Sequence, residues 1–254
     1  MREDLRMAAI GRTIARGRYV IPSAFTFCSM ACAYVSTQVP SLPTEPAWWI
    51  MYCCLLDKLD GTAARLLKAQ TSFGVQLDSA ADFLAFGIAP AHLYYRIMSK
   101  EWTFTGCEYV WGMIAVVYAL ATAWRLHRFN REAGGAQSNA FRGMPSTLSG
   151  AIFAAYVVAF LPSSGAALSV LAVLPIALAI AMNMNYRSCK VTIPKRRSLL
   201  VMQCAFVAWV YYGTFTHSYP ELLFASAMLA LAISVFGAPP AEPAPQEPAP
   251  PPGR

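Results

Sequence analysis

Apolar stretches long enough to cross a bilayer, about 20 residues as a helix, recur along the whole chain. Short polar segments separate them, so the pattern predicts many membrane-spanning helices and not a single anchor. Eight spans are expected, at residues 21–38, 46–64, 76–98, 104–124, 146–162, 166–184, 199–215 and 220–237.

The composition agrees with this pattern. Hydrophobic residues make up 57% of the 254 residues and charged residues only 13%, whereas about 25% of a soluble domain is charged. We therefore expect an all-α polytopic membrane protein with one membrane domain, residues 21–237. Residues 1–20 are rich in arginine and predict a basic segment, either an amphipathic helix on the membrane surface or a plain topology signal. Residues 238–254 are rich in proline and predict an extended, disordered tail.

The basic residues fall almost entirely on alternate loops of the eight-span topology. If the N-terminus is cytoplasmic, eighteen of the twenty Lys and Arg lie on that side, and only Arg96 and Lys100 lie on the other. Positive charge is retained in the cytoplasm, so both termini are expected there, in an inner membrane if the source is bacterial. The net charge of +7 is then explained by topology and anionic lipids, and it gives no reason to expect a nucleic-acid partner.

Four aspartates lie within residues 57–82, in a chain that has only thirteen acidic residues. Asp57 and Asp60 are three apart and share one helix face, and Asp78 and Asp82 are four apart and share another. A short polar turn between the two helices would bring the four carboxylates together near the cytoplasmic boundary. An ionised carboxylate at membrane depth costs several kcal/mol, so this cluster predicts a functional site.

Converging carboxylates repel each other unless a cation neutralises them, and an all-oxygen site suits Mg²⁺ or Mn²⁺. Two such ions could bridge phosphate oxygens during displacement at phosphorus. Gly61 and Gly74 would let a phosphorylated ligand approach the backbone, and Arg65 would supply a forked donor for phosphate. The alternative is that the aspartates form salt bridges between helices or line an ion pathway.

The stretch fits the pattern D-x2-D-G-x2-A-R-x8-G-x3-D-x3-D at every fixed position, and it resembles the CDP-alcohol phosphatidyltransferases. This resemblance implies a core of six helices, here with two more, around a polar cavity that opens to the cytoplasm. It implies that Asp57, Asp60, Asp78 and Asp82 bind metal, and that Asp82 is also the base that deprotonates the acceptor hydroxyl. The implied CDP-binding positions are Gly61, Ala64, Arg65, Thr71, Ser72 and Gly74.

Three further stretches resemble the bacterial and archaeal phosphatidylserine synthase branch of that family. They are TSFGVQLDSAADFLAFGIAP at 71–90, WRLHRFN at 124–130 and FRGMPST at 141–147. The resemblance implies that CDP-diacylglycerol and L-serine react to give phosphatidylserine and CMP. Arg125, Arg128 or Arg142 could pair with the serine carboxylate.

Two alternatives to this function remain open from the sequence. Glycerol 3-phosphate or an inositol derivative could be the acceptor within the same reaction class. A cation or lipid transporter would be a different class, and it would release no CMP. The family resemblance also makes a homodimer possible, although no interface motif stands out in the sequence.

Overall fold

The computed structural model describes residues 20, 22–41, 43–67, 71–101, 107–133, 140–161, 166–189 and 197–236. Most of the basic N-terminal segment and the whole proline-rich tail lie outside these ranges. The first helix covers residues 22–38. The remaining elements are α2 (Thr44–Leu66), α3 (Ser72–Phe83), the π-helical turn η1 (Leu84–Ile88), α4 (Ala89–Glu101), α5 (Cys107–Ala133), β1 (Ala140–Arg142), α6 (Ser146–Phe160), α7 (Ala166–Asn183), β2 (Arg187–Cys189), α8 (Arg197–Thr216) and α9 (Pro220–Phe236).

Each of the expected spans coincides with a helix or with an unbroken helical run. The third expected span, residues 76–98, corresponds to α3, η1 and α4, which follow one another without a break over residues 72–101. In the described ranges, two helical segments are both long and apolar enough to cross a membrane, Glu108–Arg131 and Ala166–Asn183, while α6 and α9 are shorter apolar helices. The helical fold is therefore confirmed, and the count of eight spans remains a prediction.

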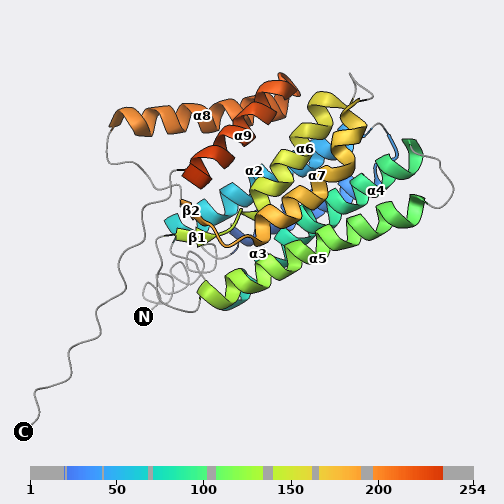
Figure 1. The fold of residues 1–254 in the computed structure, drawn as a ribbon. Helices are drawn as coiled ribbons and strands as arrows, with labels where there is room; N and C mark the ends of the chain where they lie inside the picture. Colours follow the sequence, from blue (N-terminus) through green and yellow to red (C-terminus); the bar gives the residue numbers. More distant parts are fainter. Residues whose placement is uncertain are drawn as a thin grey trace, which may run out of the picture.

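Helix α6 lies in the middle of the bundle, between α2, α7 and α9 (Figure 1). Its side chains are buried on all sides, including Ile152, Phe153, Ala154 and Val157. A helix that is apolar all round belongs in the core, and α6 accordingly carries no charged residue.

Helix α6 also packs closely against the π-helical turn. A side chain at Gly150 would meet Cδ1 of the buried Phe86 at 2.6 Å, so only glycine leaves room for this ring. Asp82 and Ser146 each lie four residues before this contact, one turn earlier on their own helical runs. The close packing of Phe86 on Gly150 therefore brings the last aspartate of the cluster to the beginning of α6.

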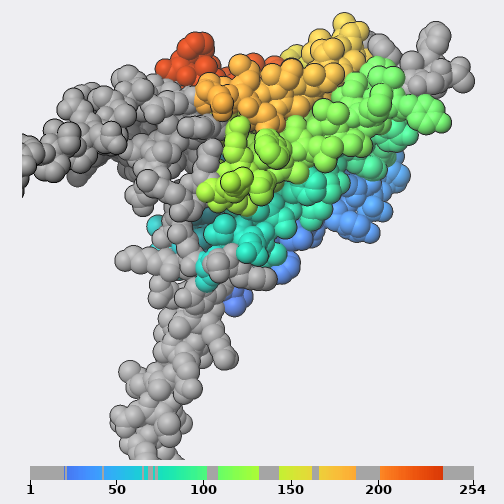
Figure 2. All heavy atoms as spheres, turned by 60° about the horizontal axis from the view of Figure 1, so that its bottom comes forward, coloured from blue at the N-terminus to red at the C-terminus, as the bar shows by residue number. Residues whose placement is uncertain are grey.

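Helices α5 and α7 lie side by side on one surface of the molecule (Figure 2). Both expose large apolar side chains: Met113 is 62% and Leu120 62% exposed on α5, and Val173 is 59% and Ile180 57% exposed on α7. Soluble proteins rarely expose continuous apolar surfaces of this kind. Since these helices are also long enough to cross a bilayer, the surface is explained by contact with lipid tails.

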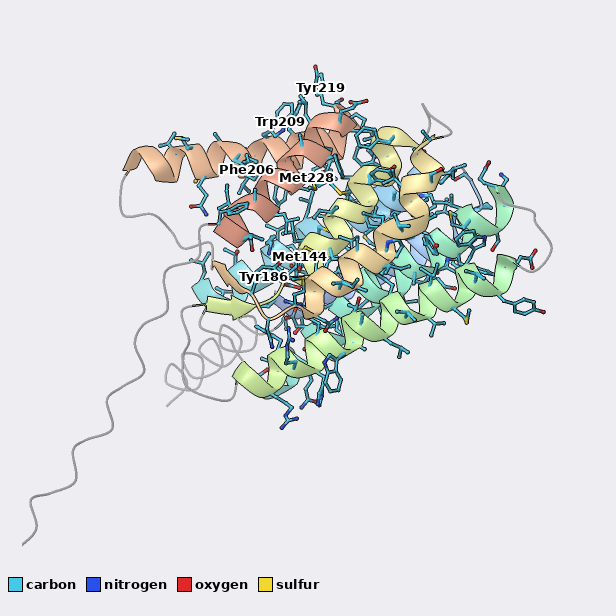
Figure 3. All side chains as sticks on the ribbon, in the orientation of Figure 1. Met144, Tyr186, Phe206, Trp209, Tyr219 and Met228 are labelled. Atoms are coloured by element: carbon cyan, nitrogen blue, oxygen red, sulfur yellow. The ribbon has the colours of Figure 1, made fainter. Side chains whose placement is uncertain are left out.

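The all-α expectation missed one small feature, a pair of three-residue strands. β1 and β2 are antiparallel, with Phe141 opposite Ser188. The chain then turns at Gly143, whose φ of 75° is in the left-handed region that favours glycine. The Gly143 N–H donates to the Tyr186 carbonyl (2.8 Å), and the Met144 N–H donates to the Ala181 carbonyl at the end of α7 (3.3 Å). Met144 and Tyr186, labelled in Figure 3, mark this junction, which fixes where α6 begins.

Candidate active site

Two helices bring three of the four aspartates together. Asp57 and Asp60 come from α2 and Asp78 comes from α3, and one ligand atom of each lies within 4.8 Å of the others. Asp60 is buried, with only 6% of its surface exposed. The sequence predicted that these carboxylates converge, and the structure confirms it for these three residues, which we call the aspartate triad.

Local sequence explains where α3 begins. Thr71 precedes the helix in an extended conformation, and its hydroxyl accepts a hydrogen bond from the Gly74 N–H at 3.0 Å, which is an N-cap. A Cβ at Gly74 would lie 3.0 Å from this hydroxyl, so glycine here keeps the cap uncrowded. Thr71 and Gly74, both expected to face the nucleotide, thus have a structural role in starting the helix that carries Asp78.

The other expected nucleotide-binding positions differ in what surrounds them. A Cβ at Gly61 would meet nothing within 4 Å, so the backbone next to Asp60 is open to an approaching ligand. Ala64 lies one turn further along α2 and is half-buried. The side chains of Arg65 and Ser72 lie outside the described residues, so their expected contacts with CDP remain predictions.

Hydroxyl side chains from two other helices support the carboxylates. The hydroxyl of Thr26, on the helix of residues 22–38, can donate its hydrogen to Asp60 Oδ2 at 3.2 Å or to the Pro22 carbonyl at 3.1 Å. Thr147 donates to Asp57 Oδ2 at 3.1 Å, and Ser146 donates to Asp82 Oδ2 at 3.4 Å. These hydroxyls were not predicted from the sequence, because the aspartates that they contact are distant along the chain. The only available signal was that Ser146 and Thr147 end the FRGMPST stretch.

Asp82 lies outside the triad but next to it. The carboxylates of Asp57 and Asp78 and the guanidinium of Arg125 are the charged groups that act on it. The π-helical turn begins two residues after it, at Leu84, and such turns are frequent at functional sites. The fourth aspartate is therefore positioned differently from the other three, with a cation and a hydroxyl beside it.

The three candidate acceptor arginines have separate environments. Arg125 donates from Nη1 to Ser146 Oγ at 2.6 Å, and its guanidinium lies over the Phe129 ring. Arg128 donates to the carbonyls of Met182 and Asn183 at 3.4 and 3.3 Å, which are among the last carbonyls of α7. The side chain of Arg142 lies outside the described residues.

Arg128 therefore donates hydrogen bonds to carbonyl groups at the C-terminus of α7, where a positive charge stabilises the helix. Arg125, in contrast, is linked through Ser146 to Asp82. Arg125 is thus the candidate acceptor arginine for which a hydrogen-bonded link to the aspartate cluster is seen.

The donor set fits a hard divalent cation. Three carboxylates within a few ångströms repel one another, and oxygen ligands of this kind suit Mg²⁺ or Mn²⁺. Lys58 lies 3.9 Å from Asp57 but is 69% exposed, so it neutralises little of this charge. The residues present could thus hold metal between α2 and α3.

A family model described as CDP-alcohol phosphatidyltransferase matches residues 19–184, well over half of the chain. The region includes the aspartates, Arg125, Ser146 and Thr147.

Several curated relatives carry the name CDP-diacylglycerol–serine O-phosphatidyltransferase. The protein of Mycobacterium tuberculosis (strain H37Rv) is 34% identical over 114 residues, which is 44% of this chain and 37% of the relative. That of Helicobacter pylori (strain 26695) is 30% identical over 129 residues, 50% of this chain and 52% of the relative. That of Bacillus subtilis (strain 168) is 37% identical over 95 residues, 37% of this chain and 50% of the relative. The matches thus cover about half or less of these relatives.

Proposed function

The protein belongs to the CDP-alcohol phosphatidyltransferase family, and we propose that it transfers a phosphatidyl group from CDP-diacylglycerol to L-serine. The products are phosphatidylserine and CMP. The names of the relatives support the choice of serine. The main structural support for this reaction class is the aspartate triad, together with Asp82 beside Arg125.

Asp57, Asp60 and Asp78 are the residues that would hold divalent cations, and we propose two ions of Mg²⁺ or Mn²⁺ with Asp82 as a further ligand. When bound, the cations would neutralise charge on the diphosphate of CDP-diacylglycerol. The hydrogen bonds from Thr26 to Asp60 and from Thr147 to Asp57 would keep these carboxylates oriented toward the shared site.

Asp82 is the proposed base. It would accept the proton of the serine hydroxyl while the hydroxyl oxygen forms a bond to the phosphorus of the phosphatidyl group. The bond from that phosphorus to the oxygen of CMP breaks, and CMP leaves. A base must lie within hydrogen-bond reach of the proton it takes, so this role requires the serine to bind between Asp82 and the triad.

Arg125 is the proposed partner of the serine carboxylate. Its guanidinium has five N–H donors, one of which is used on Ser146, and a guanidinium can pair with a carboxylate through two parallel hydrogen bonds. Arg128 is the weaker candidate because its guanidinium already donates to the end of α7. Gly61, where the backbone is open, is the proposed point of approach for the diphosphate, with Ala64, Arg65, Thr71, Ser72 and Gly74 as the other proposed CDP-binding positions.

The protein is a membrane protein, and the proposed topology has eight spans with both termini and the site on the cytoplasmic side. The distribution of Lys and Arg supports this orientation. A homodimer, implied by the family resemblance alone, is also proposed.

The test is metal-dependent CMP release by the purified protein with CDP-diacylglycerol. L-serine, glycerol 3-phosphate and inositol are compared as acceptors, with Asp82→Asn as the control variant. The proposal predicts CMP release with L-serine that is lost in Asp82→Asn. If CMP is released only with another acceptor, the reaction class is supported but serine is not the acceptor. If no alcohol leads to CMP release, a transporter is favoured.

A further inference from the structure

Ser146 lies between two charged side chains at the beginning of α6. Its hydroxyl is 2.6 Å from Nη1 of Arg125 and 3.4 Å from Oδ2 of Asp82, and the residue is fully buried (0% exposed). These three side chains come from α5, α6 and α3, so the contact joins helices that are distant in sequence.

The direction of the two hydrogen bonds follows from the chemistry of the groups. A guanidinium can only donate and a carboxylate can only accept, whereas a hydroxyl has one hydrogen to donate and lone pairs to accept with. Ser146 therefore accepts from Arg125 and donates to Asp82. Since the hydroxyl has a single hydrogen, this arrangement leaves it no donor for any other group.

The neighbouring residue on α6 serves the other part of the site. Thr147 donates to Asp57, a member of the aspartate triad, and not to Asp82. The two consecutive hydroxyls thus contact different aspartates: Thr147 contacts a proposed metal ligand, and Ser146 contacts the proposed base. The anchored turn at Gly143 and Met144 fixes both positions.

We propose that Ser146 is a positioning residue that holds Asp82 and Arg125 at a fixed separation, and so sets the fit for an acceptor that carries both a hydroxyl and a carboxylate. This inference rests on the proposed function, in which Asp82 takes the hydroxyl proton and Arg125 pairs with the carboxylate. With Oδ2 bound to Ser146, the Asp82 carboxylate cannot rotate freely. The acceptor hydroxyl then meets an oriented base, and errors of about 1 Å in such placement can cost a hundredfold in rate.

The experiment compares Ser146→Ala with Ser146→Thr and with Ser149→Ala, all in the same 254-residue chain. Ser149 is a matched control because it is on the same helix, is also fully buried, and hydrogen-bonds to Tyr118 at 3.0 Å and not to the aspartate cluster. Initial rates of CMP release are measured at varied L-serine and at varied CDP-diacylglycerol. Size-exclusion profiles and thermal melts report whether each variant is folded.

The expected result is that Ser146→Ala lowers kcat/KM for L-serine by about tenfold or more. The loss is shared between a lower kcat and a higher KM for L-serine, and KM for CDP-diacylglycerol stays within about twofold of the wild type. Ser146→Thr, which retains the hydroxyl, restores most of the activity, and Ser149→Ala behaves like the wild type.

The proposal is overturned if Ser146→Ala has the same kinetics as Ser149→Ala, if it lowers kcat without changing KM for L-serine, or if Ser146→Thr is as impaired as Ser146→Ala. These results leave the proposed function intact. If the wild-type protein itself shows no serine-dependent CMP release, the proposed function fails, and the positioning role fails with it.

Discussion

Replacing Gly143 with alanine should destabilise the junction from which α6 begins. The residue has a φ of 75°, and a Cβ there would lie 2.4 Å from the Met182 carbonyl oxygen. A left-handed conformation costs an alanine about 1–2 kcal/mol. Relief of the contact would also strain the backbone hydrogen bonds of Gly143 and Met144, each worth about 0.5–1.5 kcal/mol.

Because these two hydrogen bonds are weakened and not lost completely, the effects together predict a loss of about 2–4 kcal/mol in the free energy of unfolding. For a chain of this size, that loss corresponds to a fall in Tm of about 5–15 °C. The measurement is a thermal melt of the purified protein in detergent, followed by CMP release well below the Tm. Activity should fall as well, because Ser146 and Thr147 follow the displaced turn.

Gly112→Ala is the matched control for this variant. Gly112 is inside α5, where a Cβ would make only an ordinary contact at 3.8 Å with Tyr95, and alanine is favoured over glycine in a helix by up to about 1 kcal/mol. The control should therefore melt at or above the wild-type Tm. A Gly143→Ala protein that melts within about 2 °C of the wild type would show that this turn accommodates a Cβ, contrary to the prediction.

Three further predictions concern the site itself. Chelation of divalent cations should abolish CMP release, and added Mg²⁺ or Mn²⁺ should restore it; activity that survives chelation would contradict the metal role of the triad. Thr147→Val should raise the Mg²⁺ concentration for half-maximal rate by about fivefold, the equivalent of one lost hydrogen bond of about 1 kcal/mol to Asp57, whereas Thr147→Ser should not. Arg125→Lys should raise KM for L-serine by about tenfold, while Arg128→Lys should mainly lower the Tm; the reverse pattern would exchange the roles assigned to these arginines.

Much of the fold could be predicted because its signals are local. Hydrophobic length predicted the helices that the described residues form. The spacing of the four aspartates predicted that all four carboxylates converge from two helices, whereas the structure brings only Asp57, Asp60 and Asp78 within 4.8 Å of one another. The strand pair of β1 and β2 was missed because strands of three residues leave no periodic pattern.

The supporting hydroxyls could not be predicted from the sequence alone. Thr26 contacts an aspartate 34 residues away and Thr147 contacts one 90 residues away, and such pairs depend on how the helices pack. The same holds for Arg125 and Arg128, which are identical in type and one helical turn apart. Only the three-dimensional arrangement shows that one is linked to Asp82 and the other to the end of α7.

The proposed transfer to serine is tested most directly by the formation of phosphatidylserine from CDP-diacylglycerol and isotopically labelled L-serine by the purified protein. Labelled phosphatidylserine and CMP should form in equal amounts with Mg²⁺ or Mn²⁺ present, and neither should form with Asp78→Asn or Asp82→Asn. If both variants make labelled phosphatidylserine at the wild-type rate, or if the wild-type protein makes none, the account of the aspartate cluster as the site of phosphatidyl transfer to serine is contradicted.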